Sequence, residues 1–170
     1  MGVYQQVSRA GDKIRTGMRD DHLTDYSKIT NQIYIGSDLC KGLECPLHSV
    51  EFKKLGIMAE INLEMERVEM PTPGVEVYLW LPVMDKTAPK LGQLLVGTAA
   101  MREIVTAGHT VYVHCREGHS RSPTMVAAYL IRYEKKTVEG AVEFIGQNRP
   151  EIHLEEVQEM ALEEFWQLWK

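Results

Sequence analysis

The sequence has few cysteines and no long apolar run. Three cysteines among 170 residues are a small, odd number that does not suit a disulfide framework. We therefore expect reactive or buried thiols in a reducing compartment, with the cytoplasm as the location. No stretch approaches the roughly 18 consecutive apolar residues that a membrane-spanning helix requires. The sequence therefore predicts no membrane span.

An excess of positive charge is also missing. The chain carries 19 basic and 24 acidic residues, a formal net charge of -5. This balance argues against nucleic acid or an anionic membrane as the main partner. Much of the acidity lies between residues 151 and 164, and we expect most of these carboxylates to form the solvated face of a helix.

Strand-like and helix-like segments alternate along the chain, which has the length of one domain. Apolar residues at helical spacing, with glycines as stop signals, predict the helices, and short apolar runs predict the strands. Strands are expected at 33–35, 57–63, 75–81 and 110–113, and helices at 46–55, 91–105, from 123, 138–145 and 154–168. This alternation predicts an α/β fold, a mostly parallel central sheet with helices on both faces. Residues 1–26 lack a sustained pattern and are interpreted as an N-terminal extension.

The segment from His114 to Ser122 follows the apolar run 111–113 and leads directly into an expected helix. Five residues separate Cys115 from Arg121. In a strand–loop–helix arrangement, the backbone N–H groups of such a loop can surround one tetrahedral anion, helped by the positive end of the helix. The same field favours the thiolate of Cys115, the form of cysteine that acts as a nucleophile. The segment therefore predicts hydrolysis of a phosphomonoester through a cysteinyl-phosphate.

The spacing Cys-x5-Arg followed by Ser resembles the cysteine-dependent protein tyrosine phosphatases, and the small dual-specificity phosphatases in particular. Three further segments, 29–37, 81–85 and 148–152, resemble parts of the same catalytic domain. The resemblance covers roughly residues 27–168, so residues 27–170 are interpreted as the catalytic domain, with the fold of the tyrosine phosphatases.

The resemblance implies that Cys115 is the nucleophile and that Arg121 binds two phosphate oxygens through its planar guanidinium. Asp85 is the predicted general acid, with Asp38 and Glu117 as alternatives. Ser122 either donates its hydroxyl to the sulfur or caps the helix, and both roles stay open. The predicted phosphate cradle contains six residues: Arg116, Glu117, Gly118, His119, Ser120 and Arg121.

His114 precedes the nucleophile on a strand, so its side chain should point away from the phosphate. The resemblance implies that it orients the loop through hydrogen bonds, and we prefer this role to proton transfer. Gly118 is expected to allow close backbone approach or a positive φ.

No cofactor is expected, and no metal. Cys40, Cys45 and His48 are too unevenly spaced to make a convincing zinc site. A regulatory disulfide between Cys115 and either of the other cysteines stays open.

The preferred function is hydrolysis of phosphotyrosine, with phosphoserine and phosphothreonine, in phosphoproteins. Glu117 and His119 beside the nucleophile are expected to disfavour polyanionic inositol head groups. A phosphoinositide or other non-protein phosphate is the alternative substrate. An inactive phosphate-binding module is the alternative from another class.

Overall fold

The computed structural model describes residues 7–9, 13–17, 23–38, 46–68 and 70–170. Seven strands form one sheet in the order β1-β2-β3-β4-β7-β5-β6. Strands β4, β7, β5 and β6 run parallel to one another, whereas the pairs β1–β2, β2–β3 and β3–β4 are antiparallel. The strands are β1 (Val7–Arg9), β2 (Lys13–Gly17), β3 (Leu23–Lys28), β4 (Ile33–Gly36), β5 (Ile57–Glu64), β6 (Val77–Val83) and β7 (Thr110–His114).

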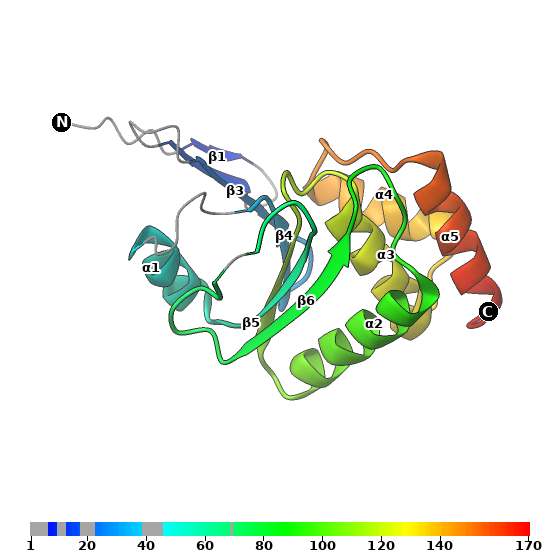
Figure 1. Ribbon diagram of the computed structural model, residues 1–170, viewed down its shortest axis with the longest axis horizontal. Helices are drawn as coiled ribbons and strands as arrows, with labels where there is room; N and C mark the ends of the chain where they lie inside the picture. Colours follow the sequence, from blue (N-terminus) through cyan, green and yellow to red (C-terminus); the bar gives the residue numbers. More distant parts are fainter. Residues whose placement is uncertain (1–6, 10–12, 18–22, 39–45, 69) are drawn as a thin grey trace.

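Helices cover both faces of this sheet, one on the first face and four on the second (Figure 1). They are α1 (Pro46–Leu55), α2 (Leu91–Thr106), α3 (Arg121–Glu134), α4 (Val138–Asn148) and α5 (Glu156–Gln167). Helix α1 packs Phe52 against Tyr112 and its neighbours, while α2 to α5 enclose the larger core. The prediction of an α/β fold with a mostly parallel central sheet and helices on both faces is confirmed.

Strand β7 lies between β4 and β5. Its residues Val111, Tyr112 and Val113 are completely buried, as expected for a parallel strand covered by helices on both sides. Helix α3 follows directly and is also buried along most of its length, since all ten residues from Ser122 to Ile131 are buried. The loop between them therefore joins two deeply buried elements of the fold.

Most predicted segments lie where the sequence placed them, with shifts of one or two residues. The predicted strand 75–81 is observed as Val77–Val83, and α3 begins at Arg121 and not at Pro123. Gly56 and Gly108, predicted to end α1 and α2, both have positive φ. Such helix ends favour glycine, which has no Cβ to clash in this conformation.

The described parts of residues 1–26 add strands that the sequence did not predict. Strands β1, β2 and β3 extend the sheet beyond β4, and β3 crosses the predicted boundary between residues 26 and 27. Asp25 and Tyr26 of β3 are buried. The division of the chain into an extension and a catalytic domain stays a prediction.

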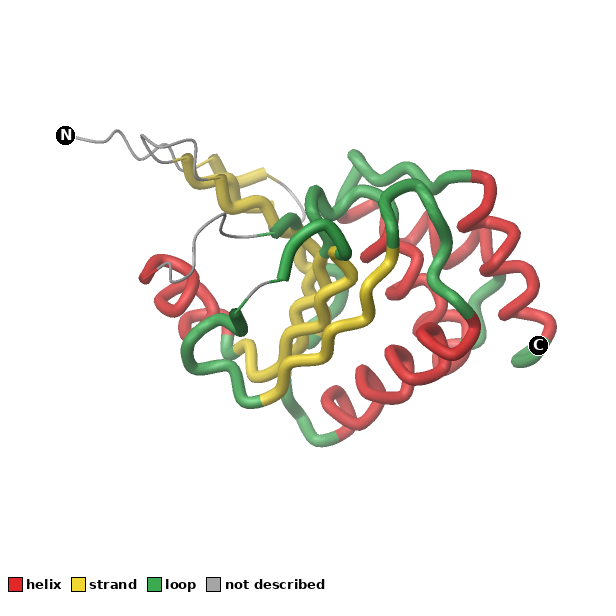
Figure 2. The backbone as a smooth tube through the Cα atoms, viewed as in Figure 1, coloured by secondary structure: helices red, strands yellow, loops and turns green. Residues whose placement is uncertain are grey.

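The loops that follow β5, β6 and β7 gather at one edge of the sheet (Figure 2). Parallel strands bring their carboxyl ends to the same edge, where ligands bind in open α/β sheets. Gly36, the last residue of β4, reaches this edge as well. It lies so close to the Tyr112 hydroxyl and the Asp25 carbonyl that a Cβ would overlap both.

Gly36→Ala should therefore destabilise the fold, with a loss of about 1–3 kcal/mol in the free energy of unfolding, the usual range for overpacking. The new methyl group would push Tyr112 away from the Ser37 carbonyl, to which its hydroxyl donates at 2.6 Å. Urea titration would measure the loss. Gly92→Ala is the control, because no atom lies within 4 Å of a Cβ there. Equal stability of the two variants would contradict the prediction.

Candidate active site

Three loops at the carboxyl ends of the parallel strands meet at Arg121. Nη1 of Arg121 donates to Oε2 of Glu66 (2.8 Å) and to the carbonyl oxygen of Val83 (2.9 Å). Nη2 lies 3.2 Å from Oδ1 of Asp85. Glu66 follows β5 and Asp85 follows β6, so the guanidinium joins both loops to the segment after β7.

Cys115 lies at the base of this arrangement and is 2% exposed. The backbone N–H of Gly118 donates to its Sγ at 3.3 Å. The hydroxyl oxygen of Ser122 lies 3.5 Å from the same sulfur. The backbone N–H donates to the sulfur, and the hydroxyl is within reach to donate to it as well.

Ser122 lies inside α3, so it does not cap the helix. The N-terminal cap position belongs to Ser120, whose side chain makes no capping hydrogen bond. The capping role that the sequence left open for Ser122 is therefore wrong. Its buried hydroxyl faces the sulfur instead.

Gly118 serves two requirements at once. Its φ is +71°, in the left-handed region that favours glycine. A Cβ at this position would overlap the backbone of Gly36. The loop therefore packs directly on the end of β4, which fixes the N–H of Gly118 at the sulfur.

The charge of Arg121 is maintained by its surroundings. Burial would lower its pKa, but the hydrogen bond to Glu66 and the negative charges of Glu66, Cys115 and Asp85 raise it. Burial likewise would raise the pKa of Glu66, but the hydrogen bond from Arg121 and nearby backbone N–H groups lower it. Both groups are therefore ionised at neutral pH. Nε of Arg121 is buried and has no hydrogen-bond partner in the described part of the chain.

A small polar pocket of about 130 Å³ opens above Cys115. Most predicted site residues line it together: Asp85, Cys115, Arg116, Glu117, His119, Ser120 and Arg121. Lys86, His153 and Glu155 complete the lining, and the sequence analysis did not name any of these three. Burial and the positive charge of Arg149 lower the pKa of His119, so its imidazole is neutral at pH 7.

His114 faces away from this pocket. Its Nε2 lies 3.0 Å from Oε1 of Glu60, and its ring stacks on Tyr112 with centroids 5.4 Å apart. Burial would raise the pKa of Glu60, but His114 and the backbone N–H of Thr72 keep it below the usual value. This geometry suits the predicted orienting role better than proton transfer at the phosphate.

Arg149 holds the outer side of the loop, and the sequence analysis missed it. Its Nε donates to the carbonyl of Gly118 (2.8 Å) and its Nη2 to the carbonyl of Glu117 (3.1 Å). Nη1 lies 3.3 Å from Oδ1 of Asp25 on β3. The side chain is completely buried. The sequence placed Arg149 only at a break before the last helix, and no local pattern signals contacts with residues 31 and 124 positions away.

Glu66 was also missed, because it lies in a loop with no periodic pattern.

The alternative acids are less well placed than Asp85. Asp38 is buried in an ion pair with Arg67 and does not line the pocket. The Glu117 side chain is 73% exposed at the rim.

Among the described residues, no group of three or more His, Cys, Asp or Glu side chains is arranged to hold a metal ion. Cys40 and Cys45 lie outside the described residues, as does the side chain of His48. The zinc and disulfide alternatives therefore stay untested. None of the helices in the described ranges is long and apolar enough to cross a membrane.

Arg149→Lys should lower kcat/KM by about tenfold to a hundredfold, because a small displacement of the loop misplaces the nucleophile. Lysine keeps the positive charge beside Asp25 but cannot span the two loop carbonyls. Turnover of para-nitrophenyl phosphate and the affinity for vanadate would both be measured. Arg102→Lys, an exposed change on α2, is the control. If only the free energy of unfolding fell, Arg149 would have no role in positioning the loop.

The chain is similar to known phosphatases over most of its length. Residues 41–167 match the family model for the dual specificity phosphatase catalytic domain. The human phosphatidylglycerophosphatase and protein-tyrosine phosphatase 1 is 44% identical over 93 residues, which cover 54% of this chain and 46% of that protein. The phosphatidylglycerophosphate phosphatase PTPMT2 of Arabidopsis thaliana is 33% identical over 122 residues, 68% of this chain and 54% of the relative. The chain thus spans about half the length of these curated relatives.

A solved structure agrees with this result. The crystal structure of PTPMT1 in complex with PI(5)P superposes with a TM-score of 0.75 at 27% identity, covering 84% of this chain and 95% of the other. The family model includes Asp85 and the whole loop from Cys115 to Arg121. The chain therefore belongs to the dual specificity phosphatase catalytic-domain family, within the cysteine-dependent tyrosine phosphatase superfamily.

Proposed function

We propose that this chain hydrolyses the phosphomonoester of a glycerophospholipid, of the phosphatidylglycerophosphate class. The observation that carries the proposal is a group of exposed apolar side chains on the loops that supply Glu66 and Asp85. Met65 and Val68 flank Glu66 and are 50% and 82% exposed, and Met84 precedes Asp85 and is 60% exposed. Apolar side chains beside a polar pocket suit a substrate with a polar head and an apolar body.

The names of two relatives support the same substrate class, since both include phosphatidylglycerophosphate or its phosphatase. The non-protein alternative of the sequence analysis is therefore better supported than its preferred phosphoprotein substrate. Glu117 and His119 are expected to disfavour inositol head groups that carry several phosphates. A lipid with one phosphomonoester is less affected, because Glu117 is at the rim and His119 is neutral.

Two cations at the pocket support a substrate with a second anionic group. Lys86 and Arg116 both line the pocket and are exposed. In phosphatidylglycerophosphate a phosphodiester lies one glycerol unit from the phosphomonoester. With the phosphomonoester in the loop, Lys86 and Arg116 are available to pair with the diester.

The reaction runs in two steps. The thiolate of Cys115 attacks phosphorus, so that the S–P bond forms and the bond from phosphorus to the glycerol oxygen breaks. Asp85 gives its proton to that oxygen, and Arg121 holds two of the remaining phosphate oxygens. Water then attacks the cysteinyl-phosphate, Asp85 takes the proton of the water, and the sulfur leaves with a hydrogen bond from Ser122.

Phosphotyrosine in proteins is the second candidate substrate. The printed name of the human relative includes protein-tyrosine phosphatase, and the mechanism above acts equally on an aryl ester. A reducing compartment is part of both proposals, because the nucleophile must stay a free thiolate. The cytoplasm itself stays a prediction.

Kinetics on three substrates tests the proposal. We expect kcat/KM for phosphatidylglycerophosphate in mixed micelles to exceed that for a phosphotyrosine peptide by at least about tenfold, which is about 1.4 kcal/mol in transition-state binding. PI(5)P should be intermediate. Cys115→Ser is the control for contaminating phosphatases, because this variant should have no activity on any of the three substrates. A preference for the phosphopeptide would make the protein substrate the better assignment and leave the mechanism unchanged.

The exposed apolar side chains Met65, Val68, Met70 and Met84, of which Met70 is 65% exposed, form an apolar rim that gives a second, separable prediction. Val68→Ser with Met70→Ser should lower activity on phosphatidylglycerophosphate in vesicles about threefold to thirtyfold. The serine side chains would not bury apolar surface against the lipid, so binding to the vesicle would be weaker. Activity on para-nitrophenyl phosphate should not change. Val50→Ser with Val96→Ser is the matched control, since both valines are about half exposed on helices away from the pocket. An equal effect on both substrates would show that the rim acts on folding or catalysis and not on the lipid.

A further inference from the structure

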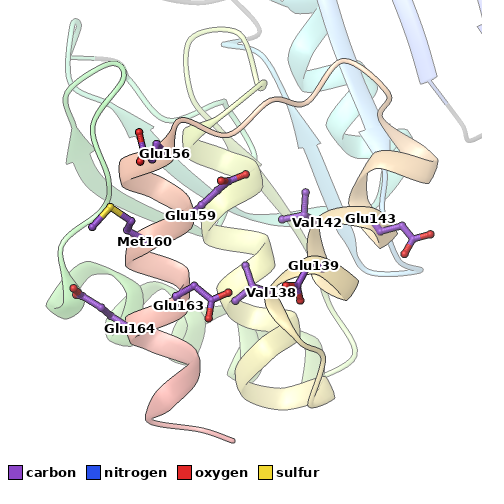
Figure 3. A pocket seen from close by; sticks show the side chains of 9 residues that line it. All are labelled: Val138, Glu139, Val142, Glu143, Glu156, Glu159, Met160, Glu163 and Glu164. Carbon is purple, nitrogen blue, oxygen red and sulfur yellow. The ribbon is translucent and has the colours of Figure 1, made fainter.

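A second hollow lies between α4 and α5, outside the active site (Figure 3). Its volume is about 750 Å³, within the roughly 300–1,000 Å³ typical of ligand pockets. Val138 and Val142 project from α4 toward α5, and Met160 of α5 also contributes to the lining. We call this hollow the α4–α5 groove.

Carboxylates surround the apolar part of the α4–α5 groove. All the other lining residues are exposed glutamates: Glu139, Glu143, Glu156, Glu159, Glu163 and Glu164. In the described part of the chain, none of the six forms an ion pair. Figure 3 shows Glu159 and Glu163 directed from α5 toward α4.

The arrangement of these charges is unfavourable for the isolated chain. Glu139 and Glu143 are four residues apart on α4, and Glu159 and Glu163 are four residues apart on α5. Like charges at this spacing lie on the same side of a helix and destabilise it. The sequence predicted only a solvated acidic face here. The structure shows that these carboxylates enclose an apolar hollow, and a cationic partner would relieve their repulsion.

Both helices of the groove are also attached to the active site. Arg149 directly follows α4 and holds the carbonyls of Glu117 and Gly118. On α5, the buried Gln158 donates to the carbonyl of Thr87, two residues after Asp85 (2.9 Å). Glu155 lines the catalytic pocket and its neighbour Glu156 lines the groove. A partner in the groove would therefore lie beside the catalytic pocket.

We propose that the α4–α5 groove binds a cationic amphipathic helix of a partner protein. Apolar side chains at i, i+3 or i+4, and i+7 of that helix would contact the valines and Met160, and flanking Lys or Arg would pair with the glutamates. The lining runs from Val138 to Glu143 on α4 and from Glu156 to Glu164 on α5, so the groove is roughly 8–12 Å long and matches about two turns. Anionic lipid and the same face of a second copy are disfavoured, because the carboxylates would repel both.

Fluorescence anisotropy with a labelled peptide tests this surface. The probe is a 14-residue peptide with leucines on one helical face and lysines beside them. A scrambled peptide of the same composition is the first control, because it lacks an apolar face. We expect Glu159→Gln with Glu163→Gln to weaken binding of the amphipathic peptide about threefold to thirtyfold, the range for two exposed ion pairs. Met160→Gln should also weaken it, and binding should fall as salt is added.

Glu76→Gln with Glu103→Gln is the matched charge control, since both glutamates are exposed and lie outside the groove. This variant should bind the peptide like the unmodified chain. All variants should keep their activity on para-nitrophenyl phosphate, which separates this proposal from the lipid assignment. Equal binding of the scrambled peptide, equal loss in the charge control, or no loss in the groove variants would overturn the proposal. So would self-association that the groove variants abolish.

Discussion

The structure depends on keeping one short loop with its N–H groups turned inward. When the backbone N–H groups of residues 115–121 face an anion, their carbonyl groups must face the protein, where each needs a hydrogen-bond donor. Arg149 supplies donors to two of these carbonyls, those of Glu117 and Gly118, from a completely buried guanidinium. The charge of Arg149 is balanced by Asp25 on β3. Strand β3, the end of α4 and the loop between β7 and α3 are thus one unit.

The second guanidinium, that of Arg121, connects the chemistry to the surrounding loops. Glu66 and Asp85 both contact it, so the loop that holds the general acid and the loop that follows β5 share one cation with the incoming phosphate. A phosphate dianion in the pocket would compete with these carboxylates for the same donors. The two acidic neighbours therefore keep Arg121 ordered before the substrate binds.

The surface of the chain carries charge in two different ways. The cations Lys86 and Arg116 line the pocket, and exposed apolar side chains lie on the loops that carry Glu66 and Asp85, which suits the anionic lipid that we propose as substrate. Around the α4–α5 groove, six carboxylates enclose an apolar hollow, which suits a cationic helix. Because the two regions meet at Glu155 and Glu156, one face of the molecule can contact substrate while the neighbouring face contacts a protein partner.

The sequence by itself placed Cys115, Arg121 and Asp85 in one site and determined the α/β order, because each of these depends on local spacing. Cys115 and Arg121 share one loop, and Asp85 follows a recognisable strand, so neighbouring residues were sufficient evidence. Only the tertiary structure decided the roles of Glu66, Arg149 and Asp25, since their partners are 31 to 124 positions away in the chain. It also decided that strands precede residue 27 and that Ser122 lies inside a helix beside the sulfur. Contacts between distant segments depend on how strands and helices pack, and no local periodicity encodes which buried charge will meet which backbone carbonyl.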